Sequence, residues 1–595
     1  MGPRLTTSGG GRANWRRTVS KFDLLIKGGT VVDGTGKERF SADVGIRDGQ
    51  ISEIAKDLAP DADQVIDASG LIVAPGGIDA HTHFDAQVHW DPYCTPHSWN
   101  GVTSSIITNC GFGYAPVRAD MRERTMAMME TTEQVPLSAQ QAVLPWSWET
   151  FPEWLEHLRS IPKGMNVSSY LPMNQLLIYV MGIDGAKSRR ATKEEMATLK
   201  EMLNQAMDAG AMGFALSHVG HTSSHTDFDG SPMPADVHDP ADFYELARVL
   251  KARGEGVIQI TANFPGTDNQ AIAEELARAS GRPIIHLVLG PYDSAPDYHR
   301  EKLEWLSKCV EEGLQIYSQP GPPNARLEFS LEYLNTWERL AAFRPFVNAS
   351  IEEKKRLCVD PEFLATAKEN YDPVVLGGSG GRWEDWRLVR AHCDAYREHE
   401  GKQLSEVVNE TDGEITALMF DLLAKSEIKA EFCMEGGSST DPEKYREILS
   451  HPNCLPGLSD GGAHLRFIAM PWYVEYISWA VRDHNVISLE DFHYKASGQA
   501  AEVLGLEKRG KIKEGFAADL AIYDLEKLEV KFPYLVIDDV PGDFRRANPP
   551  PPGMRYVIVN GVPIFVDGES TGERPGMVHS LVSKGSVQLH EEGWK

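Results

Sequence analysis

The chain has 595 residues, 42% of them hydrophobic and 24% charged, which is ordinary for a globular protein long enough to bury a large core. Its formal net charge of −27 argues against nucleic acid or an anionic membrane as a partner, because both bind basic surfaces. No window of about 18 apolar residues occurs, so no membrane-spanning helix is expected. The seven cysteines have no paired spacing, which favours a reducing cytoplasm over a disulfide framework.

The two ends of the chain share a β-strand pattern. We interpret residues 1–21 as a flexible tail, because Arg16 and Arg17 have no apolar segment behind them. Residues 22–75 contain short β-like segments separated by glycine turns, and residues 505–595 contain further strands near their end. Chain ends of one β character often pair, which predicts a small discontinuous domain made of 22–75 and 505–595.

Residues 76–504 alternate strand-like and helical segments. This alternation predicts an α/β fold with parallel strands, and eight βα units fit a TIM (β/α)8 barrel. The expected strands are Leu71–Ala74, Ser104–Asn109, Val167–Leu171, Gly213–Leu216, Val257–Thr261, Pro283–Leu287, Leu314–Ser318 and Cys454–Leu458. The expected helices include Lys193–Ala209, Pro240–Arg253, Asn269–Ala279 and Lys302–Glu312. A long insertion, from Gln319 to Leu455, separates the seventh strand from the eighth.

Metal-binding residue types follow several of these strands. His81 and His83 are two apart after the first strand, so their side chains project from one face. Cys110 follows the second strand, His286 lies in the sixth and Asp460 follows the eighth. In a barrel the C-terminal strand ends meet at one rim, where catalytic residues collect. Because imidazole, thiolate and carboxylate all bind zinc, these five residues form a predicted zinc site.

The strings GGIDAHTHFD, ITNCGFGYAPVR and LSDGGAHL, with GFAADLAIYD and VIVNGVPIFVDG near the end, resemble the amidohydrolase superfamily and, within it, the N-acyl-D-amino-acid deacylase group. The resemblance runs from about residue 22 to about residue 578. It implies a barrel beside a β-sandwich built from both chain ends. It also implies one metal site of His81, His83 and Asp460, and a second of Cys110 and His286. Asp460 would then act as general base and acid for a zinc-activated water that hydrolyses an amide C–N bond.

The chain departs from that family pattern in three places. The histidine that usually ends strand five is missing, and Gln259 or Asn263 offers only a weak oxygen ligand, so one tightly held metal ion is favoured over two. Val288 stands where the deacylases commonly place a lysine, and Met173 and Asn174 occupy a loop where they commonly place a histidine and an arginine. A buried substrate carboxylate would lack a partner beside such neutral residues. The departures weaken the D-amino-acid assignment and make an uncharged, aromatic or cyclic amide a candidate substrate.

Two loop segments leave alternatives open. The segment after the fourth strand contains His221 and His225, which could bind substrate or metal or could belong to a solvated loop. The glycine run at 376–381 lacks the lysine of a phosphate-binding loop, so we interpret it as a mobile loop near the barrel mouth.

The leading interpretation is a metal-dependent hydrolase that cleaves an N-acyl amino acid, an aryl or acyl amide, or a cyclic amide, with one or two zinc ions. The alternative is a metal-dependent C–C hydrolase or lyase in which the metal stabilises an enolate. A third reading is a degenerate, non-catalytic barrel, against which the five ligand-type residues argue. We expect a small-molecule substrate and a homo-oligomer is compatible with the sequence.

Overall fold

The computed structural model describes residues 20–581 except 224, 263–268, 293–294, 325, 333–336, 338–339, 348, 373–381, 412, 436–438 and 467–469. Most of the expected tail, Asn263 and the glycine run at 376–381 therefore lie outside the described residues. In the part of the chain that is described, no helix has the length and apolar character needed to cross a membrane. All seven cysteines are free thiols, as their spacing predicted.

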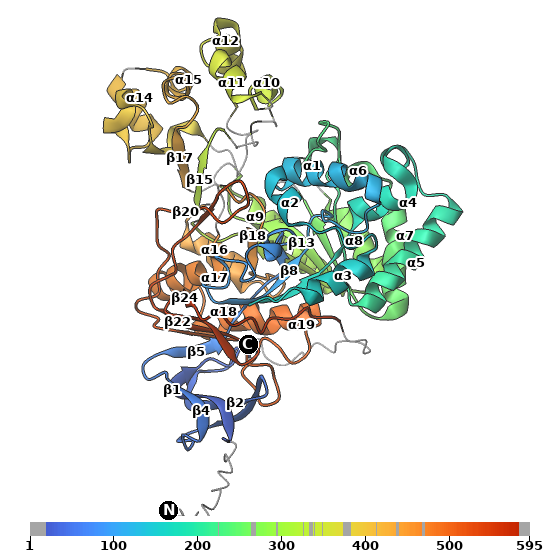
Figure 1. The fold of residues 1–595 in the computed structure, drawn as a ribbon, viewed down its shortest axis with the longest axis vertical. Helices are drawn as coiled ribbons and strands as arrows, with labels where there is room; N and C mark the ends of the chain where they lie inside the picture. The colour runs from blue at the N-terminus through green and yellow to red at the C-terminus, as the bar shows by residue number, and fades with distance from the viewer. Residues whose placement is uncertain are drawn as a thin grey trace, which may run out of the picture.

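Both chain ends contribute to one nine-stranded sheet, at the bottom of Figure 1. The N-terminal end supplies β1 (Phe22–Val31), β2 (Phe40–Arg47), β3 (Gln50–Ala55), β4 (Ala62–Asp67) and β5 (Ile72–Pro75). The C-terminal end supplies β19 (Leu520–Tyr523), β22 (Met554–Val559), β23 (Val562–Val566) and β24 (Glu569–Ser570). The two halves join where β5 and β19 pair in antiparallel fashion. The strand expected at Leu71–Ala74 is therefore part of this sheet, and its assignment to the barrel was wrong.

The middle of the chain forms parallel strands that pair mostly in chain order. They are β6 (Gly77–Asp79), β7 (His81–Thr82), β8 (Val102–Ile107), β9 (Asn166–Ser169), β10 (Leu171–Pro172), β11 (Gly213–Ser217), β12 (Val257–Thr261), β13 (Ile284–Leu289), β14 (Ile316–Pro320) and β18 (Leu458–Gly461). β6, β8 and β9 form one parallel run and β10 to β14 another, while β18 pairs with β7. A parallel bridge from Ser318 to Cys454 leads from β14 towards β18. Consecutive parallel pairing of this kind characterises an α/β fold of the TIM-barrel type.

Helices cover these strands, and their ends follow local sequence signals. They are α1 (Arg122–Thr132), α2 (Leu137–Val143), α3 (Phe151–Ser160), α4 (Met173–Ser188), α5 (Lys193–Ala209), α6 (Pro234–Val237), α7 (Pro240–Arg253), α8 (Gln270–Ser280), α9 (Tyr298–Glu311), α16 (Pro442–Ser450), α17 (Trp472–Glu475), α18 (Leu489–His493) and α19 (Ala500–Leu504). α5 begins with a capping box in which Thr192 and Glu195 satisfy each other's backbone N–H groups. α5 and α7 both end at a glycine in the left-handed conformation.

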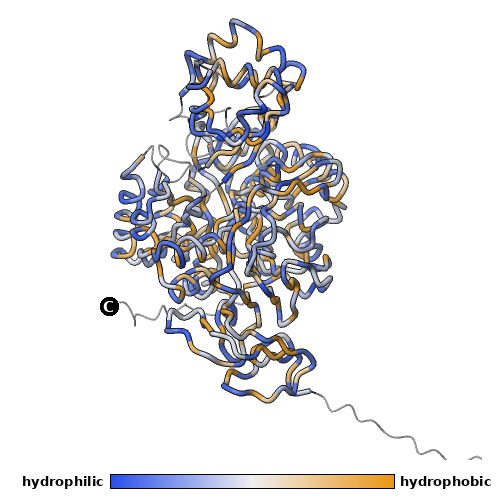
Figure 2. Tube along the Cα trace, turned by 90° about the vertical axis from the view of Figure 1, so that its left-hand side faces the viewer, coloured by the Kyte–Doolittle hydropathy of each residue, from blue (hydrophilic) through white to orange (hydrophobic). Residues whose placement is uncertain are grey.

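The insertion has a sheet and a hydrophobic core of its own. β15 (Arg326–Ser330), β17 (Glu431–Glu435) and β16 (Arg387–Arg390) pair antiparallel in that order. Its helices are α10 (Arg344–Val347), α11 (Ile351–Leu357), α12 (Pro361–Asn370), α14 (Leu404–Thr411) and α15 (Ile415–Lys425). Trp337, Trp383 and Trp386 are fully buried at its centre. Figures 1 and 2 show the insertion and the chain-end sheet at opposite ends of the parallel-strand region.

Two short strands lie between the insertion and the parallel-strand region. β20 (Leu535–Ile537) pairs with β21 (Arg545–Ala547). Arg546, buried in β21, donates to Glu431 of β17 at 3.0 Å and to the carbonyl oxygen of Arg466. Arg546 thereby joins the insertion to the segment that follows β18.

Glu475 offers a test of stability near the base of the insertion. Its buried carboxyl accepts a hydrogen bond of 2.5 Å from Asn324, and burial raises its pKa to about 7. The unfolded chain releases this proton near pH 4.5, so stability contributed by the protonated group is lost as the pH rises from about 4.5 through about 7. Glu475→Gln should therefore raise the melting temperature at pH 8.5 and change it little at pH 5. Exposed Glu507→Gln is the control, and equal effects of Glu475→Gln at both pH values would contradict the assignment.

Candidate metal centre

The candidate site contains two buried histidines, His81 and His83. β7, which contains His81, pairs with β18, and the N–H of His83 donates to the carbonyl oxygen of Gly461 at 2.6 Å. A Cβ atom on Gly462 would lie 2.4 Å from the main-chain carbon of His83. Only glycine permits this close approach, so the Asp-Gly-Gly segment and the histidine pair are held side by side.

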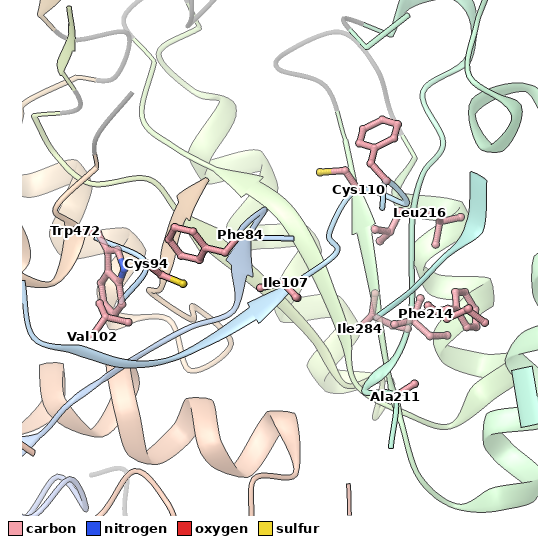
Figure 3. Packing of buried hydrophobic residues seen from close by; sticks show 14 of the residues in the cluster. Phe84, Cys94, Val102, Ile107, Cys110, Ala211, Phe214, Leu216, Ile284 and Trp472 are labelled. Carbon is pink, nitrogen blue, oxygen red and sulfur yellow. The ribbon is translucent and has the colours of Figure 1, made fainter. Parts of the chain in front are cut away.

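Cys110 reaches the two imidazoles from the next strand. It follows β8 in the left-handed conformation, with φ of 57°, and Figure 3 shows it beyond the strand end while Ile107 lies along the strand. Its Sγ atom lies 3.4 Å from Nε2 of His81 and 3.8 Å from Nε2 of His83. The three donor atoms are all within 4.8 Å of one another, in a cluster that is fully buried.

Asp460 completes the cluster from β18. Its Oδ1 atom lies 3.5 Å from Nε2 of His81 and 3.3 Å from Nε2 of His83. Its side chain is 27% exposed, whereas those of His81 and His83 are 0% and 1% exposed. Anything that approaches the cluster from solvent therefore meets Asp460 first.

His81, His83 and Cys110 are spaced to hold a divalent ion, and Asp460 lies beside the two imidazoles. Zinc binds nitrogen at about 2.0–2.1 Å and sulfur at about 2.3 Å, which gives tetrahedral edges of roughly 3.3–3.8 Å. The four distances from Cys110 and Asp460 to the two imidazoles, at 3.3, 3.4, 3.5 and 3.8 Å, fall in that range. Two imidazoles, a thiolate and a carboxylate are also the donor types that zinc accepts. The geometry and the donor types therefore suit a divalent metal ion.

Burial alone would disfavour the charged forms of these groups. It lowers the pKa of His81 to about 3 and raises the pKa of Cys110 to about 11. Burial also raises the pKa of Asp460, but the hydrogen bond and charge of His83 outweigh it and hold that pKa well below its usual range. A neutral imidazole and an ionised carboxylate are metal-binding forms, and a thiol that coordinates a metal is deprotonated outright.

His286 does not join the cluster, and its prediction as a ligand is contradicted by its position. Strand partners share a face, and His286 pairs with Ile260 and Ser318, whereas Thr261, whose hydroxyl reaches Cys110, pairs with Leu287. The His286 ring meets Trp305 of α9 edge-on at 5.0 Å, and its Nε2 lies 2.9 Å from Oδ1 of Asn269. His286 therefore faces the helices.

The predicted substrate-binding residues have different surroundings. The His225 ring packs edge-on against Phe112 at 5.4 Å, and its charge acts on His81, so it lies near the cluster. His221 is exposed in the same loop. Asn174 uses its side chain for main-chain bonds to Gly111 and Ala235. Met173 and Val288 are buried, and Asn263 lies outside the described residues.

Glu133 is a site residue that sequence analysis missed. It is the C-cap of α1, 1% exposed, with Oε2 at 3.6 Å from Nδ1 of His83. Its carbonyl oxygen also accepts a hydrogen bond from the N–H of His464 at 2.7 Å. Carboxylates behind metal-binding histidines orient the ring and strengthen its basicity. No spacing in the sequence links residue 133 to His83; only the path of the loop after β8 brings them together.

Glu133→Gln should weaken zinc binding about 10–100-fold, because it removes the charge behind His83 while preserving side-chain volume. Competition with a chelator measures the affinity, and circular dichroism confirms the fold. Glu130→Gln, at an exposed position of the same helix, is the matched control. An unchanged affinity in Glu133→Gln would show that the carboxylate does not support His83.

Comparisons with known proteins identify the family. A family model described as "Amidohydrolase family" matches residues 64–284 and 441–565. N-acyl-D-aspartate deacylase of Alcaligenes xylosoxydans xylosoxydans is 27% identical, with 94% of this chain and 95% of the relative covered, and D-aminoacylase of the same organism is 26% identical, with 94% and 97% covered. The crystal structure of N-acyl-D-glutamate deacylase from Bordetella bronchiseptica, complexed with zinc and a phosphonate inhibitor, has a TM-score of 0.62 at 22% identity and covers 94% of this chain and 100% of that one.

The matched segments contain His81, His83, Cys110 and Asp460, and leave out residues 285–440, which make up most of the insertion. The resemblance found in the sequence motifs is thus confirmed. The chain belongs to the amidohydrolase family and is a metal-dependent hydrolase of carbon–nitrogen bonds other than peptide bonds.

Proposed function

We propose that this enzyme hydrolyses the amide bond of a small acylated molecule with one zinc ion held by His81, His83, Cys110 and Asp460. The observation that carries the proposal is the buried group of His81, His83 and Cys110, whose donor atoms all lie within 4.8 Å of one another, with Oδ1 of Asp460 at 3.5 and 3.3 Å from the two imidazoles. A second ion lacks support, because His286 faces the helices and strand five ends in Gln259 and Thr261 instead of a histidine.

Each protein group has a separate part in the reaction. A divalent ion in the cluster would polarise the amide carbonyl and provide an activated water near neutral pH. Asp460, ionised at rest and exposed to the substrate side, accepts a proton on its carboxylate and returns it to the leaving nitrogen. His81 and His83, both fully buried, hold the donor geometry and keep bulk water away.

The substrate we propose has no obligatory carboxylate beside the scissile bond. The relatives' names describe N-acyl-D-amino acids. In this chain Met173, Asn174 and Val288 are neutral and buried, and the amide of Asn174 is engaged by main-chain groups. A neutral acyl or aryl amide or a cyclic amide would avoid burying an unpaired charge.

A matched substrate pair tests the proposal. N-acetyl-D-phenylalanine and its carboxamide differ only in the charge that is in question, and acetate release reports cleavage of the same bond in both. A six-membered lactam serves as the cyclic substrate. We expect a higher kcat/KM for the carboxamide than for the acid. A preference for the acid would overturn the substrate proposal, and the absence of hydrolysis across an extended amide panel by zinc-loaded enzyme would overturn amide hydrolysis.

The finer architecture belongs to the same proposal. We infer that the parallel strands form a closed (β/α)8 barrel over residues 76–504 and that the chain ends fold into a β-sandwich domain of 22–75 and 505–595. The pairing of β18 with β7 supports closure, since it joins the last parallel strand to the first. A cytoplasmic location is in keeping with seven free thiols.

A further inference from the structure

Strand five contacts Cys110 through three linked hydrogen bonds. The N–H of Cys110 donates to Oε1 of Gln259 at 2.8 Å. Nε2 of Gln259 donates to Oγ1 of Thr261 at 2.8 Å, and Oγ1 of Thr261 lies 3.2 Å from Sγ of Cys110. Gln259 is fully buried and Thr261 nearly so, which means that water does not compete for these groups.

Donor and acceptor chemistry fixes the direction of this chain. Because Oε1 of Gln259 must accept from the Cys110 N–H, its amide nitrogen is the group that points to Thr261. The Thr261 oxygen accepts that bond, so its single proton is free to point at the sulfur. A hydroxyl that donates to a thiolate forms a charge-assisted hydrogen bond.

His286 supports Thr261 from outside the barrel. Asn269 donates through Nδ2 to the carbonyl oxygen of Thr261 at 2.9 Å, which leaves its Oδ1 atom to accept from Nε2 of His286 at 2.9 Å. The residue expected to bind metal is thus two hydrogen bonds removed from Thr261, on the far side of the strand.

We propose that Thr261, oriented by Gln259, is a positioning residue that donates a hydrogen bond to the metal-binding sulfur of Cys110. The inference rests on the proposed function, since it requires Cys110 to be a ligand. The bond directs one sulfur lone pair towards Thr261 and another towards the ion, and it withdraws charge from the thiolate, which makes the ion a stronger Lewis acid. In this arrangement β12 adjusts the charge on a ligand of one metal ion and supplies no ligand to a second ion.

Cobalt substitution tests this directly. The sulfur-to-cobalt charge-transfer band of the Co²⁺-loaded enzyme reports the energy of the sulfur lone pairs. Thr261→Val removes the hydroxyl at nearly constant volume, so the band should move to longer wavelength and the zinc dissociation constant should rise about 10–100-fold. Thr261→Ser, which keeps the hydroxyl, should restore both values. Thr261→Ala gives a second deletion of the hydroxyl if the valine variant does not fold.

The possible outcomes distinguish failure of the proposed role of Thr261 from failure of the proposed metal site. Cys110→Ser should abolish the band and so identifies its origin. Suppose that the wild-type enzyme shows the band, and that the Thr261→Val and Thr261→Ala variants fold, bind cobalt and show it at the same wavelength. Thr261 then does not donate to the sulfur, although the proposed metal site remains supported. If the wild-type enzyme binds cobalt without any sulfur band, the proposed ligand set itself is wrong.

Discussion

Asp460→Asn should lower kcat about 10²–10⁴-fold, the range that a positioned general acid–base group contributes. The asparagine keeps an oxygen where Oδ1 now lies near His81 and His83, so the donor shape survives, but it cannot accept and return a proton at neutral pH. The expected loss is in kcat, because the proton transfers occur in the chemical step. Steady-state kinetics on a hydrolysed amide, at matched zinc content, measures the effect.

Metal content and fold must be checked beside this rate. Asp120→Asn, at an exposed position outside the cluster, is the control for a general effect of the substitution. Retention of more than about a tenth of wild-type kcat by zinc-loaded Asp460→Asn would remove Asp460 from the proton steps, since even a modest general base contributes 10²-fold.

Cys110→Ser should reduce zinc affinity at least about 100-fold, more than the 10–100-fold that loss of an outer partner costs. Serine keeps the size of the side chain but replaces the soft anionic donor with a neutral hydroxyl. His286→Gln should leave zinc affinity and stoichiometry unchanged, because glutamine can still donate to Asn269 and because His286 does not face the ion. Equilibrium dialysis with zinc analysis gives both quantities.

The pair of variants decides between one ion and two. Wild-type enzyme and His286→Gln should each hold one zinc ion per chain. A second ion in the wild-type enzyme that disappears in His286→Gln would contradict the single-ion site and return His286 to the ligand set.

Much of the fold followed from local signals in the sequence. α5 and α7 each begin after a capping residue and end before a left-handed glycine. The bounds of both helices were predicted to the residue. The second to seventh expected strands overlap parallel strands of the structure, the eighth meets β18 only at Leu458, and the first is β5 of the chain-end sheet instead of β6 or β7. Short apolar strands look alike in sequence, and only long-range pairing with β19 distinguishes β5.

The sequence indicates candidate site residues that lie at or near strand ends, but it does not indicate contacts that depend on side-chain orientation or on the path of a loop. His81 and Asp460 lie in short strands, His83 and Cys110 follow strands, and the four come together at one place. His286 lies within β13, where a shift of one residue exchanges the inner face for the outer one. The sequence spacing near Glu133 and Thr261 does not indicate that they contact His83 and Cys110, because those contacts depend on the three-dimensional course of the chain.

The pairing of β5 with β19 also affects the order in which this protein folds during synthesis. β5 leads directly into the histidine pair, yet one of its two neighbours, β19, is synthesised almost 450 residues later. On the ribosome, β5 has β1 beside it on one edge and an open edge on the other until the C-terminal strands emerge. Contacts that join such distant segments form slowly and late. The strand that anchors the metal centre therefore reaches its final pairing only when nearly the whole chain has been made.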